Sequence, residues 1–222
     1  MKRLGILSVL FAFIALVAWH PQDDAKTRYA KWKRQYAQEQ IKALKGGTLL
    51  VRLHSRDKSV NLYRQNGQHE IANKIEDEQF QENKAIVAAF TRYFNFSKVY
   101  FFNADDTEKI KAGNMQGIFL NSQMQGDATI APRLDTFMVA EFGPLEGETR
   151  VIPGDTLVPL PDYVSGEVLE RALVIRDKNF MQMRDPFPYY IRGANRSKIE
   201  KQVTRLNERL QSYYLNATKP RP

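Results

Sequence analysis

The feature that most constrains this chain is a nearly uninterrupted apolar run close to its N-terminus. Residues 4–19 contain no charged side chain and only one polar one, Ser8. Lys2 and Arg3 precede the run, and a polar stretch beginning at His20 follows it. A helix built from this run has no polar face to turn towards water. The basic–apolar–polar layout is that of a secretory signal peptide, so we expect an exported domain in the periplasm or another extracytoplasmic compartment.

The length of the run leaves two forms of export open. Its 16 residues are somewhat few for a membrane span, which needs about 20, and somewhat many for the apolar part of a signal peptide. Ala18 suits the position directly before a cleavage site. Leu16, two residues earlier, is larger than the small residue that signal peptides usually have there. A cleaved signal peptide and an uncleaved signal anchor therefore both remain. A buried core helix is the third alternative, and the missing polar face argues against it.

Composition excludes several kinds of chemistry. The chain has 222 residues, 43% of them hydrophobic, which suits one globular domain with a tail. It has no cysteine, which excludes disulfides, thiolate nucleophiles and zinc–thiolate sites. Its three histidines are too few for a histidine-rich metal centre. Because the glycine-rich nucleotide motifs are also missing, we predict neither a metal nor another cofactor.

The net charge of +8 is concentrated at the two ends of the chain. Residues 23–45 carry +4 and residues 192–222 carry +6, whereas residues 46–191 carry −4. A basic protein can bind nucleic acid, but an exported chain without a nucleic-acid motif gives no reason to expect this partner. The first basic segment follows the apolar run directly. An anionic membrane surface is therefore a natural partner for it, and a plain solvated helix face is the equally open alternative.

Short apolar runs alternate with helical patterns along the rest of the chain. Strands are predicted at 48–53, 99–103, 117–121, 136–142 and 171–177, with 180–183 as the second arm of a hairpin. Helices are predicted at 23–45, 59–65, 70–95, directly after Asp105-Asp106, and 197–214. This order favours an α/β or α+β fold, with a single mixed sheet of about five or six strands covered by helices. An N-terminal signal or anchor helix and a long C-terminal helix complete it.

Four segments are expected along the chain. They are a signal peptide or anchor over 1–20, a basic amphipathic helix over 21–46, a mixed α/β body over 47–193, and a C-terminal helix with its tail over 194–222. The basic helix has an aromatic-rich stripe at helical spacing, which should pack on the body, a membrane surface or a partner. The C-terminal helix has a two-heptad apolar seam, which favours docking on its own domain over a coiled coil.

Residues 143–168 form a long connection rich in proline and glycine. Connections of this length are uncommon in compact domains and are often functional. The segment is therefore a candidate binding loop, with Asp155 and Asp162 as candidate binding residues, and a loop without a role is the alternative. The spacing of its acidic residues does not match a calcium-binding EF-hand loop.

The only local grouping with catalytic residue types is His54-Ser55-Arg56-Asp57, directly after the first predicted strand. Sites in α/β sheets form at strand ends, so His54 and Asp57 are the candidate catalytic residues. Neighbours in sequence point in different directions, however, and do not form a Ser–His–Asp triad by themselves.

Two functions from different classes follow. The first is a non-enzymatic envelope protein that binds a partner protein, an anionic membrane surface or a cell-wall glycan. The second is an exported hydrolase that uses His54, Asp57 and acids of the 143–168 loop. A carboxylate within hydrogen-bond reach of His54 in a concave pocket favours the hydrolase, and an isolated His54 on a convex surface excludes it.

Overall fold

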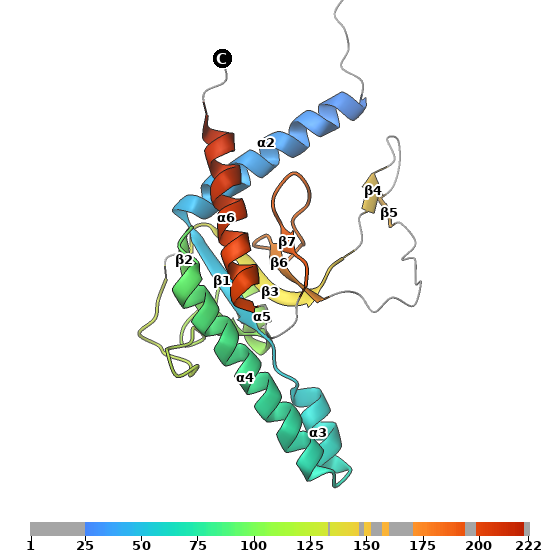
Figure 1. The fold of residues 1–222 in the computed structure, drawn as a ribbon, viewed down its shortest axis with the longest axis vertical. Helices are drawn as coiled ribbons and strands as arrows, with labels where there is room; N and C mark the ends of the chain where they lie inside the picture. Colours follow the sequence, from blue (N-terminus) through green and yellow to red (C-terminus); the bar gives the residue numbers. More distant parts are fainter. Residues whose placement is uncertain are drawn as a thin grey trace, which may run out of the picture.

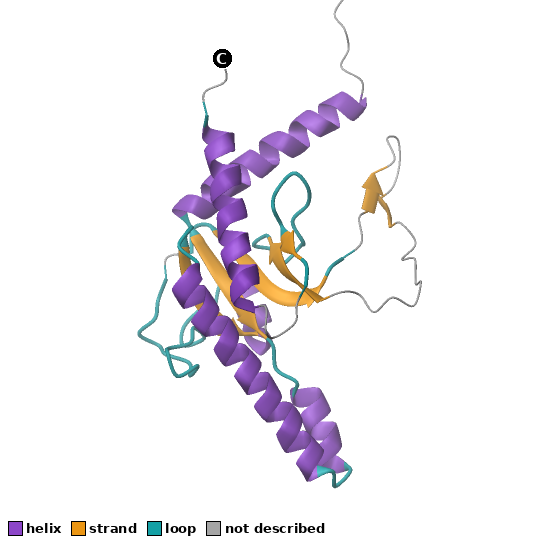
Figure 2. Cartoon of the chain, viewed as in Figure 1, coloured by secondary structure: helices purple, strands orange, loops and turns teal. Residues whose placement is uncertain are grey.

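A five-stranded mixed sheet lies at the centre of the molecule, with long helices packed against it (Figures 1 and 2). The computed structural model describes residues 25–132, 134–146, 149–151, 157–159, 171–193 and 199–219. The helices are α2 (Ala25–Gly46), α3 (Asp57–Gln65), α4 (His69–Tyr93), the 3-10 turn η1 (Ala104–Asp106), α5 (Thr107–Lys111) and α6 (Ile199–Thr218). The strands are β1 (Thr48–Leu53), β2 (Lys98–Asn103), β3 (Phe137–Pro144), β4 (Thr149–Val151), β5 (Leu157–Pro159), β6 (Arg171–Arg176) and β7 (Tyr190–Ile191).

The sheet has the strand order β2-β1-β3-β6-β7. β1 runs parallel to both β2 and β3, whereas β6 is antiparallel to β3 and to β7. β4 and β5 form a separate two-stranded antiparallel sheet. The prediction of a single mixed central sheet with about five strands and a long C-terminal helix is confirmed.

Both faces of the sheet are covered, which explains why its central strands read as continuous apolar runs. Leu49, Val51 and Leu53 of β1 face α4, α6 and part of α2 in the main core. Leu50 points to the other face, where it packs with Ile110 of α5 in a smaller core. Side chains alternate along a strand, so each neighbour in sequence contributes to a different core.

The C-terminal helix packs on its own domain. Ile199, Val203, Leu206 and Leu210 are buried in the main core, as expected for the docked alternative. Asn207 strengthens the docking, because its side-chain oxygen accepts hydrogen bonds from the backbone N–H groups of Asn95 and Phe96, each 3.0 Å long. The apolar seam of α6 therefore packs against the rest of the same chain.

Two predicted strands are reduced to isolated bridges. Residues 117–121 form isolated bridges instead of a strand, because Asn121 turns the chain back: its side-chain oxygen accepts bonds from the backbone N–H groups of Gln123 and Gln125. Residues 180–183 return antiparallel beside β6 as predicted, but they form an isolated bridge and not a strand. Asp177 holds a tight turn there, Gln182 makes an isolated bridge to Arg176, and β7 supplies the strand next to β6.

Several expectations fall outside the described residues. Within 143–168, the structure describes the end of β3 and the small β4–β5 sheet, but Asp155 and Asp162 lie in ranges that it does not describe. The predicted signal or anchor segment lies in residues 1–24, which are also outside. Among the helices that the structure describes, none combines the length and apolar character needed to cross a membrane.

Candidate functional site

A cluster of charged side chains lies on the three central strands, and each strand contributes one residue to it. Glu141 of β3 is 1% exposed and lies between Arg52 of β1 and Arg176 of β6. The Nε atoms of the two arginines each donate a hydrogen bond of 2.5 Å, Arg52 to Oε2 and Arg176 to Oε1. Both carboxylate oxygens are thereby paired, which is the condition for burying a charge in a core.

His54 joins this cluster from the end of β1. Its Nε2 atom lies 3.2 Å from Oε2 of Glu141, and its side chain is 34% exposed. The side-chain amide of Asn83 donates a 2.9 Å bond to the His54 backbone oxygen. Because an ionised carboxylate only accepts hydrogen bonds, Nε2 carries the hydrogen in this contact, and in the neutral ring Nδ1 is the acceptor nitrogen.

The surroundings of Glu141 keep it ionised. Burial by itself raises the pKa of this carboxyl, but the hydrogen bond from His54 and the charges of Arg52 and Arg176 outweigh it and lower the pKa from 4.5 to about 2. A carboxylate held in this way is a poor proton acceptor near neutral pH. Within the cluster, Glu141 can orient His54, and His54 is the group with a free acceptor nitrogen.

A second layer of contacts holds Arg176. The guanidinium Nη1 of Arg176 forms an ion pair with Glu146 and donates a 3.1 Å bond to the backbone oxygen of Phe180. Burial lowers the pKa of Arg176, but its bonds to Glu146 and Glu141 raise it above the ordinary value. Gln182 adds two bonds to the backbone of Glu146, which ties the segment after β3 to the turn after β6.

The cluster lies near a point where the chain leaves adjacent parallel strands on opposite sides. After β1 the chain continues to α3 and α4, and α4 packs on the main core. After β2 it continues to α5, which packs on the opposite face. Ser55 and Asp105 meet between these two strand ends, with a 3.3 Å hydrogen bond from Oγ to Oδ2. The carboxyl ends of strands at such switch points are the usual ligand sites of α/β sheets.

The structure separates the two candidate catalytic residues. His54 belongs to the cluster, whereas Asp57 is exposed in the first turn of α3, and the carboxylate that meets His54 comes from β3. Glu141, Arg52 and Arg176 were missed because they lie inside predicted core strands. The available signal was a charge within each apolar run, since a charge in a buried strand needs a partner from a neighbouring one.

A second feature is an aromatic ladder on α2, formed by Tyr29, Trp32 and Tyr36. The rings stack in sequence, with centroids 5.9 Å apart for Tyr29–Trp32 and 5.5 Å apart for Trp32–Tyr36. Trp32 is 57% exposed and Tyr29 43%, whereas Tyr36 is half-buried. The ladder belongs to the outer half of α2, residues 25–36, which extends away from the sheet in Figure 1. The inner half, residues 37–46, is anchored in the main core.

A groove of about 170 Å³ separates the ladder from the turn that follows β6. Its far wall comes from the 177–185 segment and includes Asp177, Arg184 and Asp185. Burial, followed by the charge of Asp177, raises the pKa of the Tyr36 hydroxyl, so this phenol stays neutral at physiological pH. The groove thus has one aromatic wall and one polar wall.

The outer half of α2 is also strongly basic. Its stretch from Arg28 to Tyr36 carries four basic residues and no acidic one. Within the part of the chain that the structure describes, none of the four pairs with a carboxylate. The four residues are Arg28, Lys31, Lys33 and Arg34. This half of the helix therefore combines exposed aromatic rings with uncompensated positive charge.

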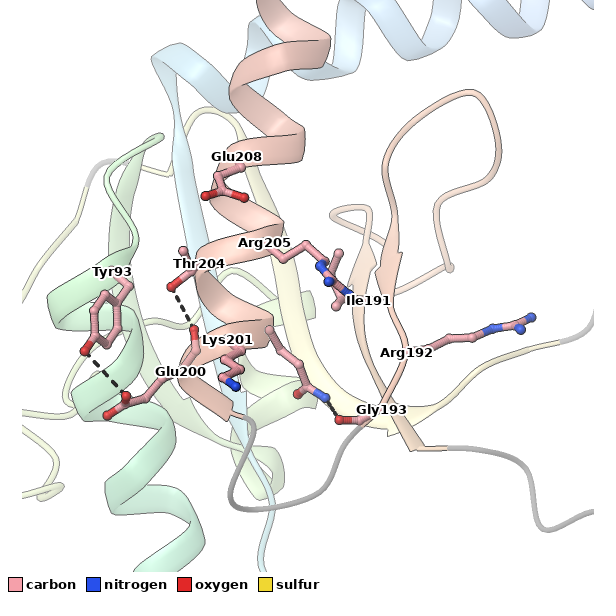
Figure 3. Close-up of a pocket in the computed structure, with 10 residues that line it drawn as sticks. Tyr93, Ile191, Arg192, Gly193, Glu200, Lys201, Thr204, Arg205 and Glu208 are labelled. Atoms are coloured by element: carbon pink, nitrogen blue, oxygen red, sulfur yellow. Dashed lines mark hydrogen bonds between the residues drawn. The ribbon is translucent and has the colours of Figure 1, made fainter.

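A larger cavity of about 610 Å³ lies between α6, the end of α4 and β7 (Figure 3). Its lining mixes both charges, and Arg192 points away from α6. The side chain of Gln202 donates to the backbone oxygen of Gly193, while its Oε1 atom is buried and accepts no bond from a described residue. Residues 194–198, which connect β7 to α6, lie outside the described ranges, so we assign no ligand to this cavity.

The described residues contain no group of three or more carboxylate or imidazole side chains placed to hold a metal ion. In comparisons with known proteins, no family model, no curated protein and no solved structure matches this chain. The function of the chain is therefore inferred from the geometry of its own residues.

Proposed function

We propose that this chain is an exported or membrane-anchored bacterial envelope protein that works as a binding module, and that the outer half of α2 is its binding surface. The observation that carries the proposal is the aromatic ladder, of which Trp32 and Tyr29 are the exposed part. A helix that only served the core would end its aromatic stripe where the core ends. Here the stripe continues beyond the core with its rings stacked and open.

Rigid aromatic side chains are suited to binding because they contribute a large contact area with few rotatable bonds. Single exposed apolar residues such as Leu62 are normal on protein surfaces and need no partner. The ladder differs from such single residues because its three rings stack on one another and together form one wall of a groove. Contiguous exposed apolar surface of this kind is typical of interaction sites.

The proposed location rests on the apolar run at residues 4–19, whose layout is that of an export signal. α2 begins only a few residues after this run, so its outer half is close to the proposed signal or anchor. The partner classes that fit an exported basic and aromatic surface are an envelope protein, an anionic membrane surface and a cell-wall glycan. We do not propose a nucleic-acid partner for an exported chain.

The test of location is protease treatment of intact spheroplasts that contain the full chain with a C-terminal tag. The proposal predicts that the body is degraded without cell lysis, and that alkaline extraction separates the anchored form from the secreted one. A full-length chain that is protected from protease and found in the cytosolic fraction contradicts the proposal. A cytosolic protein of known protease sensitivity in the same cells serves as the control for lysis.

A second candidate function, an exported hydrolase, is favoured by one observation. His54 has a carboxylate partner at 3.2 Å near the switch point of the sheet, as a general base held in one tautomer would have. Among the contacts of the described residues, however, none brings a hydroxyl nucleophile to His54, and Ser55 bonds to Asp105 instead. The hydrolase therefore lacks one part that its mechanism needs.

Turnover of chromogenic ester, amide and glycoside substrates by the purified chain distinguishes the two functions. The hydrolase predicts activity that His54→Ala lowers by about 100-fold or more. The binding module predicts no activity above that of the substrate without protein. His69→Ala is the matched control for the hydrolase and should leave any activity unchanged, since His69 lies at the start of α4 and outside the cluster.

A further inference from the structure

We infer that the outer half of α2 lies on an anionic phospholipid surface, with Tyr29 and Trp32 at the headgroup level and Arg28 and Lys33 bound to lipid phosphates. The inference rests on the proposed function, because it names the partner of the same surface. Of the three partner classes, the membrane surface is the one that the tether length, the charge and the ring types favour together.

The first argument is the length of chain between the apolar run and the helix. The run ends at Trp19 and α2 begins at Ala25. Six residues span at most about 22 Å even when fully extended. In the anchored form, the start of α2 therefore stays within this distance of the bilayer. Such a short tether raises the effective concentration of lipid at the helix far above that of a free partner.

The second argument is charge. The stretch from Arg28 to Tyr36 carries four basic residues and no acidic one, which produces a positive field on this half of the helix. Lys33 also lines the groove whose far wall includes Asp177 and Asp185, so Arg28, Lys31 and Arg34 are the charges that no described carboxylate faces. Anionic lipid headgroups attract such a segment, and each basic residue near the surface strengthens the attachment about fivefold. A neutral glycan gains nothing from this charge, so the basic character of the helix favours the lipid.

The third argument is the arrangement of rings and charges around the helix. Residues four apart lie next to each other on a helix, so Arg28 adjoins Trp32 and Lys33 adjoins Tyr29. Tryptophan and tyrosine are enriched where hydrocarbon meets headgroups, and helices with one aromatic stripe among basic residues lie in that plane. Exposure decreases along the ladder from Trp32 to the half-buried Tyr36, so the outer pair of rings is the part left free to contact lipid.

The spacing also supplies a matched control on the same half-helix. By the same periodicity, Lys31 and Arg34 lie away from the ladder, and both are exposed. The double variants Arg28→Gln/Lys33→Gln and Lys31→Gln/Arg34→Gln remove the same charge from the same segment. The inference predicts that the first pair weakens lipid attachment about 25-fold and that the second pair has a clearly smaller effect.

The readout is the fluorescence of Trp32 in the full chain. The chain has two tryptophans, so Trp19→Phe leaves Trp32 as the only one. The chain is reconstituted into vesicles that contain lipids brominated near the headgroup, with either anionic or zwitterionic headgroups. The expected result is a blue-shifted, strongly quenched Trp32 in anionic vesicles. The quenching should disappear in about 1 M salt, where charges are screened within about 3 Å, and in the Arg28→Gln/Lys33→Gln variant.

Failure of the inference and failure of the proposed function give different results. If the body is exported but Trp32 is quenched equally in anionic and zwitterionic vesicles, or in neither, anionic lipid is not the partner. An envelope protein and a cell-wall glycan then remain as the candidate partners of this surface. A Trp32 that responds to soluble cell-wall fragments and not to anionic lipid likewise overturns the inference. If the body is not exported, the proposed function itself fails.

Discussion

The Nε2 atom of His54 lies 3.2 Å from Oε2 of Glu141, at the end of a strand and beside a carboxylate that two arginines already hold. The contact brings together residues 87 positions apart in the chain. It makes Glu141 the central member of a four-residue cluster in which the positive charges outnumber the negative one. The stability of the sheet should therefore depend on this carboxylate.

Removing the charge of Glu141 should destabilise the fold strongly. In Glu141→Gln, Arg52 and Arg176 keep a polar neighbour but lose the ionised one, and breaking a buried ion pair costs about 3–5 kcal/mol. Chemical denaturation gives the free energy of unfolding. The control is Glu76→Gln, which breaks the exposed Arg64–Glu76 pair and should cost less than about 1 kcal/mol. Similar losses for the two variants contradict the central role of Glu141.

The same carboxylate should make stability depend on pH in a defined range. The pKa of Glu141 is lowered in the folded chain, from 4.5 to about 2. Its contribution is therefore complete above about pH 4.5 and is lost as the pH falls towards 2, on the order of 3 kcal/mol in all. Unfolding curves of the unaltered chain and of Glu141→Gln should converge over this range. A constant difference between them down to pH 2 contradicts the assignment.

The two halves of α2 should respond differently to truncation. Leu44→Ala in the buried inner half should cost about 2–5 kcal/mol, because it leaves a cavity in the main core. Trp32→Ala in the outer half should cost less than about 1 kcal/mol, since the ring is mostly exposed and loses mainly its stacking contacts. The free energy of unfolding of each variant checks this. Equal losses would mean that Trp32 serves the fold and is not held free for a partner.

The docking of α6 depends on a polar residue inside an apolar seam. Asn207→Ala leaves the backbone N–H groups of Asn95 and Phe96 without their acceptor. The loss should cost about 1–3 kcal/mol for the buried group of Phe96, and less for that of Asn95, which is exposed. Hydrogen exchange should become faster in α6 and in the turn after α4. Unchanged protection in both segments would contradict the role of Asn207.

Most of the fold could be predicted from local patterns. The run at 48–53 is bounded by glycines and a polar turn, and it is strand β1 over the predicted residues. The turn at Asp177 was predicted, but the strand prediction failed at 117–121, where the side chain of Asn121 redirects the backbone. Such turns compete with strand pairing through local hydrogen bonds that an apolar pattern does not register.

The site could be predicted only in part. The position of His54 directly after a strand was enough to predict it as a candidate site residue. Its partner Glu141 could not be predicted without knowing the strand order. Pairing of β1 with β3 places Arg52 beside Glu141, and that pairing depends on contacts distant in sequence. The aromatic stripe of α2 was visible as a pattern. Which part of it the core covers could only be known once the length of the sheet was known.

The most direct test of the proposed binding surface is photo-crosslinking from position 32 in intact cells. A photoreactive residue replaces Trp32 in the full chain, and a second chain carries it in place of Leu62 of α3, which is almost equally exposed at 58% against 57%. The account predicts that position 32 forms a crosslink to an envelope component, with phospholipid as the expected product, and that position 62 does not. Equal crosslinking from the two positions, or none from position 32, would contradict it.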